Sequence, residues 1–409
     1  MYGFVLEGGG AKGSYHIGVW KALRELEVEI SAVTGTSIGA INGAFIALDM
    51  YDEVYDIWYN ADMSMGVSGD NETLTKLVTM NFEMNGYKKL FSFIKKSIAD
   101  GGLDVSPMKK MIEDNIDEEK LRKSKIDYGL VTISLTDFKP IEVFKENIPD
   151  GLLHDYIMAS ANLPIFKTDR VDGKIFLDGG FHDNLPINLM ASKGYKDIIA
   201  VRGGGVGRNT ELVHDDLNIT YINPSGDTGN TMEFISSRTR ENLKMGYYDT
   251  MKVFNKLKGN KYFIDTELRD EECFAMLSRI SDEKIKKLSK IFGESSRSPK
   301  MFLFEEIVPS IAKMLKLGEE STYMDVFIAL LEFIGQYYEL DRYRILTLKE
   351  FIAELDKAFL AAGQIKEFIN MDVLPDALKH TNLYKYSAKD SILINLFEIL
   401  RNELKELDI

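Results

Sequence analysis

Cysteine is almost absent from this sequence of 409 residues, and so is an excess of positive charge. The one cysteine is Cys273, which excludes an intrachain disulfide. Fifty lysines and arginines stand against 64 aspartates and glutamates, which gives a net charge of −14. Such a surface repels nucleic acid phosphates, and no basic stripe with interleaved aromatics offsets the repulsion. We therefore expect no nucleic acid partner, and contact with anionic lipid only through local patches.

Long hydrophobic runs are also missing. None reaches the roughly 18 residues that a membrane-spanning helix needs. The sequence begins with a strand-like segment over residues 3–7 and has no charged region or cleavage site ahead of it, which argues against a secretory signal peptide. These absences predict a cytoplasmic protein. Peripheral membrane association and export without a cleaved signal stay open.

The first part of the chain alternates short apolar runs with helical patterns, which is typical of a parallel sheet with crossover helices. We expect strands at residues 3–7, 30–34, 128–134, 175–177, 198–202 and 217–222. After residue 260 strand signals nearly vanish, and apolar residues recur at spacings of three and four. The sequence therefore predicts an α/β domain over residues 1–260 and an all-helical domain over residues 261–409.

A glycine-rich loop, Gly8 to Gly13, lies between the first strand and the first helix. Glycines let the backbone approach a ligand closely, and the helix that follows presents free N–H groups. The loop therefore suits an anion, either a phosphate or a developing oxyanion. Its spacing also matches a dinucleotide fingerprint, but neither Glu27 nor Glu29 stands clearly at the end of the second strand. A nucleotide-binding oxidoreductase remains the weaker alternative.

A G-x-S-x-G elbow, Gly35 to Gly39, joins the second strand to an apolar helix. A serine in such a turn exposes its hydroxyl, so Ser37 is a candidate nucleophile; the alternative is a tight turn that merely contains serine. Only one strand and one helix precede Ser37, unlike in an α/β-hydrolase. The Gly8 to Gly13 loop is then the one earlier candidate for an oxyanion hole. Adjacent parallel strands would bring both turns to the same edge of the sheet.

No histidine is compelling as the base that would activate Ser37. His16 and His154 lie near helix starts, where surface positions are more common, and His182 has no clear strand end to present it. Asp178 instead ends an apolar strand and is followed by Gly179 and Gly180. A carboxylate there can accept the serine proton if its pKa and distance suit. The alternative is an ordinary turn-forming aspartate.

Taken together, these residues resemble the patatin-like phospholipases, whose pattern is a G-G-G-x-[KR]-G loop, a G-x-S-x-G elbow and a distant D-G-[GA]. The matching segments are Gly8–Gly13, Gly35–Gly39 and Asp178–Gly180, with lesser likeness at 159–164 and 183–187. The resemblance covers roughly residues 1 to 255. It implies a three-layer α/β/α sandwich with a mostly parallel sheet, and a Ser37–Asp178 dyad without histidine. It also implies hydrolysis of acyl esters in phospholipids or related lipids.

The expected mechanism is acyl transfer through an acyl-enzyme, with no cofactor and no metal, since no ligand cluster has the required spacing. The predicted oxyanion-hole residues are Gly8, Gly9, Gly10 and Ile38. The predicted supporting residues are Lys12, Gly13, Gly35, Gly39, Gly179 and Gly180. Lys12 supports the loop, meets lipid phosphate, or is simply solvated. A non-catalytic lipid-binding protein would normally lose Ser37 or Asp178, and both are present.

Partners other than a lipid substrate are less defined. The C-terminal helices could form a homo-oligomer, pack on the domain or shape access to the site. Two segments that mix lysine with apolar residues, 87–96 and 284–292, are candidates for membrane contact. The alternative for each is an ordinary amphipathic helix with its apolar face buried.

Overall fold

The computed structural model describes residues 1–66, 68, 102–167, 170–292, 297–362 and 389–405. The chain divides into two compact units, Met1–Val253 and Phe254–Ile409. The sequence-based boundary at residue 260 falls a few residues later. The membrane-contact candidate at 87–96 and the histidine His380 lie outside the described residues.

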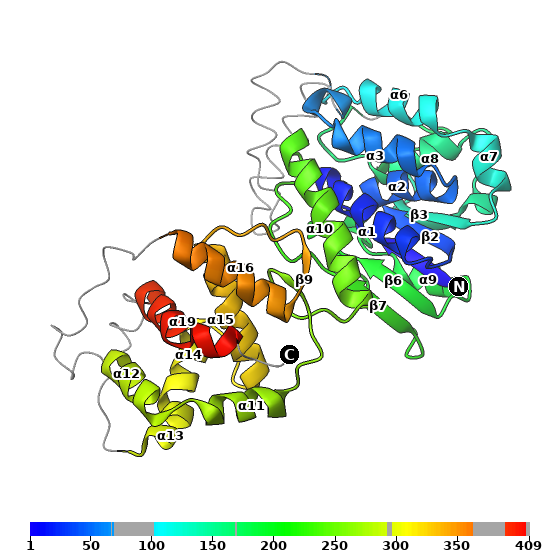
Figure 1. Cartoon of the computed structure of the whole chain (residues 1–409). Helices are drawn as coiled ribbons and strands as arrows, with labels where there is room; N and C mark the ends of the chain where they lie inside the picture. The colour runs from blue at the N-terminus through cyan, green and yellow to red at the C-terminus, as the bar shows by residue number, and fades with distance from the viewer. Residues whose placement is uncertain (67, 69–101, 168–169, 293–296, 363–388, 406–409) are drawn as a thin grey trace. The chain divides into compact units, whose positions relative to one another are not determined.

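A seven-stranded, mostly parallel sheet forms the centre of the first unit (Figure 1). Six strands follow the order β4-β3-β2-β1-β6-β7, and β5 pairs separately with β3. Their bounds are β1 Tyr2–Leu6, β2 Ile30–Thr36, β3 Asp127–Ser134, β4 Lys139–Phe144, β5 Phe176–Asp178, β6 Asp197–Val201 and β7 Asn218–Ile222. Only β4 and β5 run antiparallel to their neighbour β3. The predicted mostly parallel sheet is confirmed, but the largely exposed β4 was not predicted.

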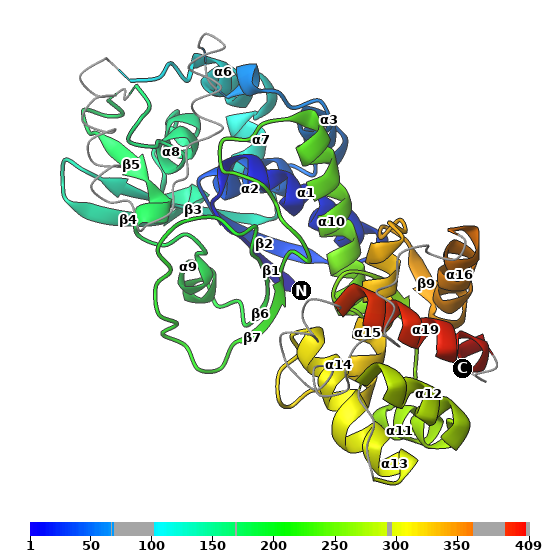
Figure 2. The same ribbon diagram turned by 90° about the vertical axis from the view of Figure 1, so that its left-hand side faces the viewer.

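Helices cover both faces of this sheet (Figure 2). Helices α2 (Ile38–Ala47) and α8 (Leu153–Ser160) pack on one face, with α1 (Ser14–Glu25) beside α2. The short α9 (Ile187–Ser192) packs against β1, β2 and β6 on the other face, where Met190 joins Val5 and Ile198 in a buried cluster. The remaining helical segments of the unit are η1 Gly10–Gly13, α3 Tyr51–Tyr59, η2 Met63–Met65, α6 Ser106–Asn115, α7 Glu118–Lys123, η4 Lys145–Asn147, η5 Gly179–Phe181 and α10 Ser236–Phe254.

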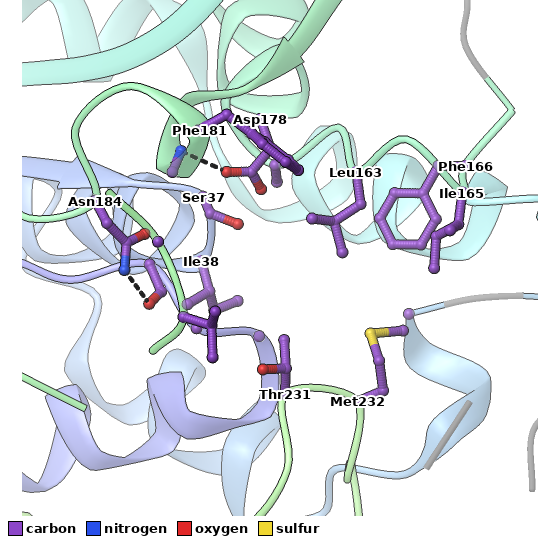
Figure 3. A pocket seen from close by; sticks show the side chains of 18 of the residues that line it. Ser37, Ile38, Leu163, Ile165, Phe166, Asp178, Phe181, Asn184, Thr231 and Met232 are labelled. Carbon is purple, nitrogen blue, oxygen red and sulfur yellow. Dashed lines mark hydrogen bonds between the residues drawn. The ribbon is translucent and has the colours of Figure 1, made fainter. Parts of the chain in front are cut away.

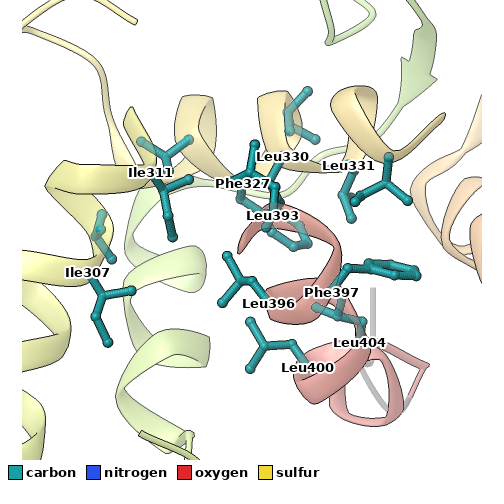
Figure 4. Packing of buried hydrophobic residues seen from close by; sticks show 14 of the residues in the cluster. Ile307, Ile311, Phe327, Leu330, Leu331, Leu393, Leu396, Phe397, Leu400 and Leu404 are labelled. Atoms are coloured by element: carbon teal, nitrogen blue, oxygen red, sulfur yellow. The ribbon is translucent and has the colours of Figure 1, made fainter. Parts of the chain in front are cut away.

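The second unit is helical, as predicted, and also contains two short parallel strands that were not predicted, β8 (Phe263–Asp265) and β9 (Ile345–Thr347). Its helices are α11 Asp270–Arg279, α12 Asp282–Phe292, α13 Pro299–Phe302, the π-helical η6 Leu303–Ile307, α14 Val308–Met314, α15 Tyr323–Tyr337, α16 Leu348–Ala361 and α19 Lys389–Lys405. Figure 4 shows side chains of α14, α15 and α19 converging on one apolar core.

Helix α12 contains the second candidate for membrane contact, residues 284–292. Its apolar side chains Ile285, Leu288 and Phe292 are buried in the core of the second unit, while Lys286 and Lys287 are exposed. This segment is therefore an ordinary amphipathic helix, and the interpretation as a membrane-docking surface is wrong because those apolar groups already have a protein partner. In the described parts of the chain, no helix is both long and apolar enough to cross a membrane.

Candidate active site

Ser37 stands alone between the end of β2 at Thr36 and the start of α2 at Ile38. Its backbone has φ 56° and ψ −124°, a region that non-glycine residues seldom occupy. The turn closes tightly: a Cβ on Gly35 would lie 2.2 Å from the carbonyl carbon of Gly39, and one on Gly39 would lie 2.4 Å from the Leu6 carbonyl oxygen. Glycine is therefore required on both sides of the serine. The predicted elbow is present in its strained form.

The strained turn is held by Ser160, the last residue of α8. The Ser37 N–H donates to Ser160 Oγ at 2.9 Å, and the Ser160 hydroxyl donates to the Val131 carbonyl at 2.7 Å. Ser160 is fully buried. Sequence analysis noted this serine only within a segment resembling the family, because nothing in its local pattern indicates a partner so far away in the chain.

Asp178 ends β5, and its side chain starts the turn that follows. Its Oδ1 accepts the Gly180 N–H at 2.7 Å, and its own N–H donates to the Asn162 carbonyl at 2.8 Å. Gly179 lies against β3, where a Cβ would come within 2.2 Å of the Val131 carbonyl oxygen. The predicted supporting glycines thus belong to the turn that orients the carboxylate.

The Asp178 carboxylate is buried and only partly hydrogen-bonded. Burial raises its pKa to about 6, although the Ser37 hydroxyl and the Gly180 N–H act in the opposite direction. Figure 3 shows the Ser37 side chain next to this carboxylate. Yet Oδ2 has no partner in hydrogen-bonding geometry within the described structure. The site therefore holds a carboxylate that can take a proton, with a hydroxyl beside it.

The glycine-rich loop supplies fewer free N–H groups than the sequence predicts. The Gly8 N–H donates to the Asn184 carbonyl at 3.0 Å, so the prediction that Gly8 helps to form an oxyanion hole is wrong. Asn184 also donates from Nδ2 to the Gly8 carbonyl at 3.1 Å, which fixes the loop from both sides. For Gly9, Gly10 and Ile38, no acceptor of the N–H is recorded among the described residues, and all three border the same pocket.

A second glycine-rich loop, residues 203–207 after β6, packs on the first and was missed from the sequence. The Gly205 N–H donates to Glu7 Oε2 at 3.0 Å, and Lys12 Nζ donates to the Gly204 carbonyl at 2.5 Å. Burial raises the pKa of Glu7 and lowers that of Lys12. Lys12 thus supports the loop, and it does not line the pocket. The missed signal was a run of three glycines directly after a strand, the same pattern that singled out Gly8–Gly13.

The remaining predicted support, Gly13, ends η1 and packs against Ile38. It precedes α1, whose first residue, Ser14, donates from its hydroxyl to the Ala11 carbonyl. Among the histidines, His16 is buried, contrary to expectation, and burial lowers its pKa to about 3. Its Nδ1 lies 3.3 Å from Asn42 Nδ2, and the residue does not line the pocket.

The pocket that contains Ser37 and Asp178 has a volume of about 400 Å³. Its far part is apolar, as Figure 3 shows. The apolar lining includes Ile41, Met108, Leu163, Ile165, Phe166, Met232 and Phe234. Among the described lining residues, Asp178 is the only acid and Arg208 the only base. No described histidine lines it.

The geometry also bears on the dinucleotide alternative. Glu27 and Glu29 both precede β2. That strand ends at Thr36 and is followed by Ser37, so no carboxylate stands at its end. The acidic residue that would bind a ribose is thus missing from its usual place. No group of three or more described His, Cys, Asp or Glu residues is arranged to hold a metal ion.

Known proteins with similar sequences include a lysophospholipase and a patatin-like phospholipase domain-containing protein. Lysophospholipase NTE1 of Kluyveromyces lactis is 30% identical over 264 residues, 63% of this chain and 16% of that protein. A patatin-like phospholipase domain-containing protein of Caenorhabditis elegans, ZK370.4, is 28% identical over 251 residues, 58% of this chain and 16% of that protein. Among solved structures, VipD from Legionella pneumophila aligns with 99% of this chain and 87% of its own at 14% identity and a TM-score of 0.40.

This chain therefore matches only a small part of those two longer relatives. The family model of patatin-like phospholipase matches residues 4–191, which include the end of β1, the elbow and the Asp178 turn. Residues 4–191 of this chain therefore form a patatin-like phospholipase domain.

Proposed function

We propose that this chain hydrolyses acyl ester bonds of phospholipids or related lipids, with Ser37 as nucleophile and Asp178 as its base. One observation carries the proposal. A buried carboxylate with an unpartnered oxygen lies beside the hydroxyl of a strained serine, at one end of an otherwise mostly apolar pocket. The domain match over residues 4–191 and the names of the relatives are consistent with this chemistry.

The first half of the reaction forms an acyl-enzyme. Asp178 accepts the hydroxyl proton while Ser37 Oγ attacks the ester carbonyl carbon. The negative charge that develops on the carbonyl oxygen is stabilised by the N–H groups of Gly9, Gly10 and Ile38, for which no other acceptor is recorded among the described residues. The alcohol leaves with the proton from Asp178 as the tetrahedral intermediate collapses. The acyl chain occupies the apolar part of the pocket, beside Leu163 and Phe166.

The second half repeats these steps with water. Asp178 takes a proton from a water molecule, which attacks the acyl-enzyme carbonyl, and the same N–H groups bind the oxyanion. The proton then returns to Ser37 as the fatty acid leaves. A pKa of about 6 suits this alternation, because the carboxylate is ionised near neutral pH and still basic enough to take a proton.

A substrate screen tests the proposal. Purified wild type, Ser37→Ala and Asp178→Asn are assayed on p-nitrophenyl esters of increasing chain length, then on defined phospholipids and lysophospholipids. We expect ester hydrolysis by the wild type only. Full activity in either variant, or an active wild type labelled by a fluorophosphonate at another serine, contradicts the assignment. Tight binding of a nicotinamide or flavin cofactor would favour the oxidoreductase instead.

A further inference from the structure

Arg208 is the one cationic residue among the described residues that line the pocket, in a chain whose net charge is −14. Its side chain is exposed, and among the described residues no ion pair or hydrogen bond of its guanidinium is recorded. Other arginines of the first unit, such as Arg24 and Arg122, are paired with carboxylates. Arg208 thus presents an uncompensated positive charge to the candidate active site.

The backbone of Arg208 is anchored to the candidate site itself. Its N–H donates to the Gly180 carbonyl at 2.8 Å, and its carbonyl accepts the Asn184 N–H at 2.6 Å. Gly180 is the residue whose N–H holds Asp178. A short chain of hydrogen bonds therefore fixes the position of the Arg208 backbone relative to the Asp178 carboxylate.

Asp183, the residue before Asn184, already has hydrogen-bond partners. Asp183 Oδ2 accepts the Thr210 hydroxyl at 2.7 Å, and Oδ1 accepts the N–H groups of Thr210 and Leu185 at 3.3 and 3.4 Å. These hydrogen bonds tie Asp183 to Thr210, two residues after Arg208, and no ion pair between Asp183 and Arg208 is recorded among the described residues. Lys12, the cation of the first glycine-rich loop, donates to the Gly204 carbonyl. Of these two cations, only Arg208 is available to a ligand.

We infer that Arg208 binds the phosphate of a lipid head group while the ester lies at Ser37. This inference rests on the proposed function and adds its substrate class: the site favours phosphate-bearing lipids over neutral acylglycerols. If the acyl chain occupies the apolar part of the pocket, the head group of the substrate lies along the polar part of the lining. The planar guanidinium matches two phosphate oxygens, whereas a neutral glycerol offers it no charge.

Binding of two non-hydrolysable lipids tests the inference directly. An ether-linked lysophosphatidylcholine and an alkylglycerol of the same chain length are titrated below their critical micelle concentrations into wild type, Arg208→Ala, Arg208→Lys and Arg202→Ala. Arg202 is the matched control: it is exposed and lies, like Arg208, between β6 and β7, but its guanidinium lies over the Tyr221 ring and Arg202 does not line the pocket. The same proteins are assayed on lysophosphatidylcholine and monoacylglycerol.

We expect wild type and Arg202→Ala to prefer the phosphate-bearing lipid, and Arg208→Ala to lose about 5- to 10-fold of that preference, as for one partly exposed charge-assisted contact. Arg208→Lys should keep part of it. Preference unchanged in Arg208→Ala, an equal loss of affinity for both lipids, or the same loss of preference in Arg202→Ala overturns the inference. Displacement of the lysolipid by equimolar inorganic phosphate overturns the lipid source of the anion.

The two proposals fail in different ways. If the wild type hydrolyses no ester but its binding preference depends on Arg208, the proposed function is wrong and the head-group site stands. If hydrolysis depends on Ser37 and Asp178 but the binding preference does not depend on Arg208, the enzyme assignment stands and the head-group site is wrong.

Discussion

Thr36, the last residue of β2, and Asp178, the last residue of β5, lie opposite two consecutive residues of β3, Val131 and Thr132. Because β4 occupies the other edge of β3, β2 and β5 meet end to end along a single edge. β2 runs parallel to β3, and β5 runs antiparallel to it. The C-terminal ends of β2 and β5 therefore meet at this junction. Ser37 is the next residue after Thr36. The pairing of the strands alone thus brings the candidate nucleophile to the candidate base.

Loss of either member of this pair should abolish activity without unfolding the chain. Ser37→Ala and Asp178→Asn should each lower kcat by at least about 10³-fold, and the double variant should be no slower than either single variant, as for groups that act as a unit. An asparagine can still accept the Gly180 N–H, so the turn should persist. Stopped and continuous ester assays with circular dichroism check this. Additive losses in the double variant would contradict the dyad.

Activity should rise with pH through the pKa of Asp178. The carboxylate accepts the serine proton only when ionised, and burial places its pKa at about 6. The pH profile of kcat/KM on a soluble ester should therefore follow a single ionisation near pH 6 and reach a plateau above it. His16 is buried with a pKa lowered to about 3, so it should not contribute in this range. A profile that is flat between about pH 5 and 8 would count against Asp178 as the base.

Stability should change with pH in the opposite direction. The pKa of Asp178 is about 6 in the folded chain against an ordinary value of 3.8, so the folded state holds the proton more tightly. The protonated Asp178 carboxyl therefore contributes to the free energy of unfolding. This contribution is complete below the unfolded pKa and is lost as pH rises through about 6, and it amounts to at most about 3 kcal/mol. Asp178→Asn removes this loss. Urea unfolding at about pH 4 and pH 8 should show the variant gaining stability relative to wild type as pH rises.

Alanine substitution can distinguish the contributions of Gly9 and Gly10 to catalysis from their contributions to stability. At Gly9 the backbone is extended, with φ 169°, and a Cβ would lie 3.3 Å from Gly205 Cα, so alanine fits with a small adjustment. At Gly10, φ is +57° and a Cβ would lie 2.1 Å from the Thr231 carbonyl oxygen. Gly9→Ala should lower kcat by about 10-fold or more with little change in KM, whereas Gly10→Ala should also lower the free energy of unfolding.

Steady-state kinetics and urea unfolding of both glycine variants check this distinction. An unchanged kcat in Gly9→Ala would remove that loop from the oxyanion hole. Equal unfolding free energies for the two variants would show that the loop adapts at Gly10, contrary to the contact with Thr231.

The sequence predicted those parts of the site that depend on local geometry. The G-x-S-x-G spacing predicted the elbow because Gly35 and Gly39 must touch each other and Leu6 for the turn to close. Asp178 was predicted because an aspartate after an apolar strand and before glycines has a defined place at a sheet edge. The mostly parallel sheet was predicted because short apolar runs alternate with helical patterns.

What depends on contacts between distant segments was not predictable from the pattern. The hydrogen bond from Gly8 to Asn184 spans 176 residues and removes a donor that the motif offers. The antiparallel direction of β5 and the exposed edge strand β4 likewise follow from pairing with β3. The strands β8 and β9 have only three residues each, too short for a recognisable alternation.

Ser160 provides the test of how the elbow is held. Its hydroxyl accepts the Ser37 N–H and donates to the Val131 carbonyl, so Ser160→Ala removes the partner of one part-buried N–H and one hydrogen bond to a buried carbonyl. We expect kcat to fall about 10-fold and labelling of Ser37 by a fluorophosphonate to slow in parallel, because the strained φ of Ser37 is no longer fixed. The free energy of unfolding should fall by about 1–3 kcal/mol.

Ser192→Ala is the matched control: its hydroxyl also donates to a carbonyl, that of Leu189, but it lies outside the pocket lining. If Ser160→Ala loses stability and yet labels at the wild-type rate, then Ser160 stabilises the fold only, and the geometry of the elbow is maintained by Gly35 and Gly39 without it.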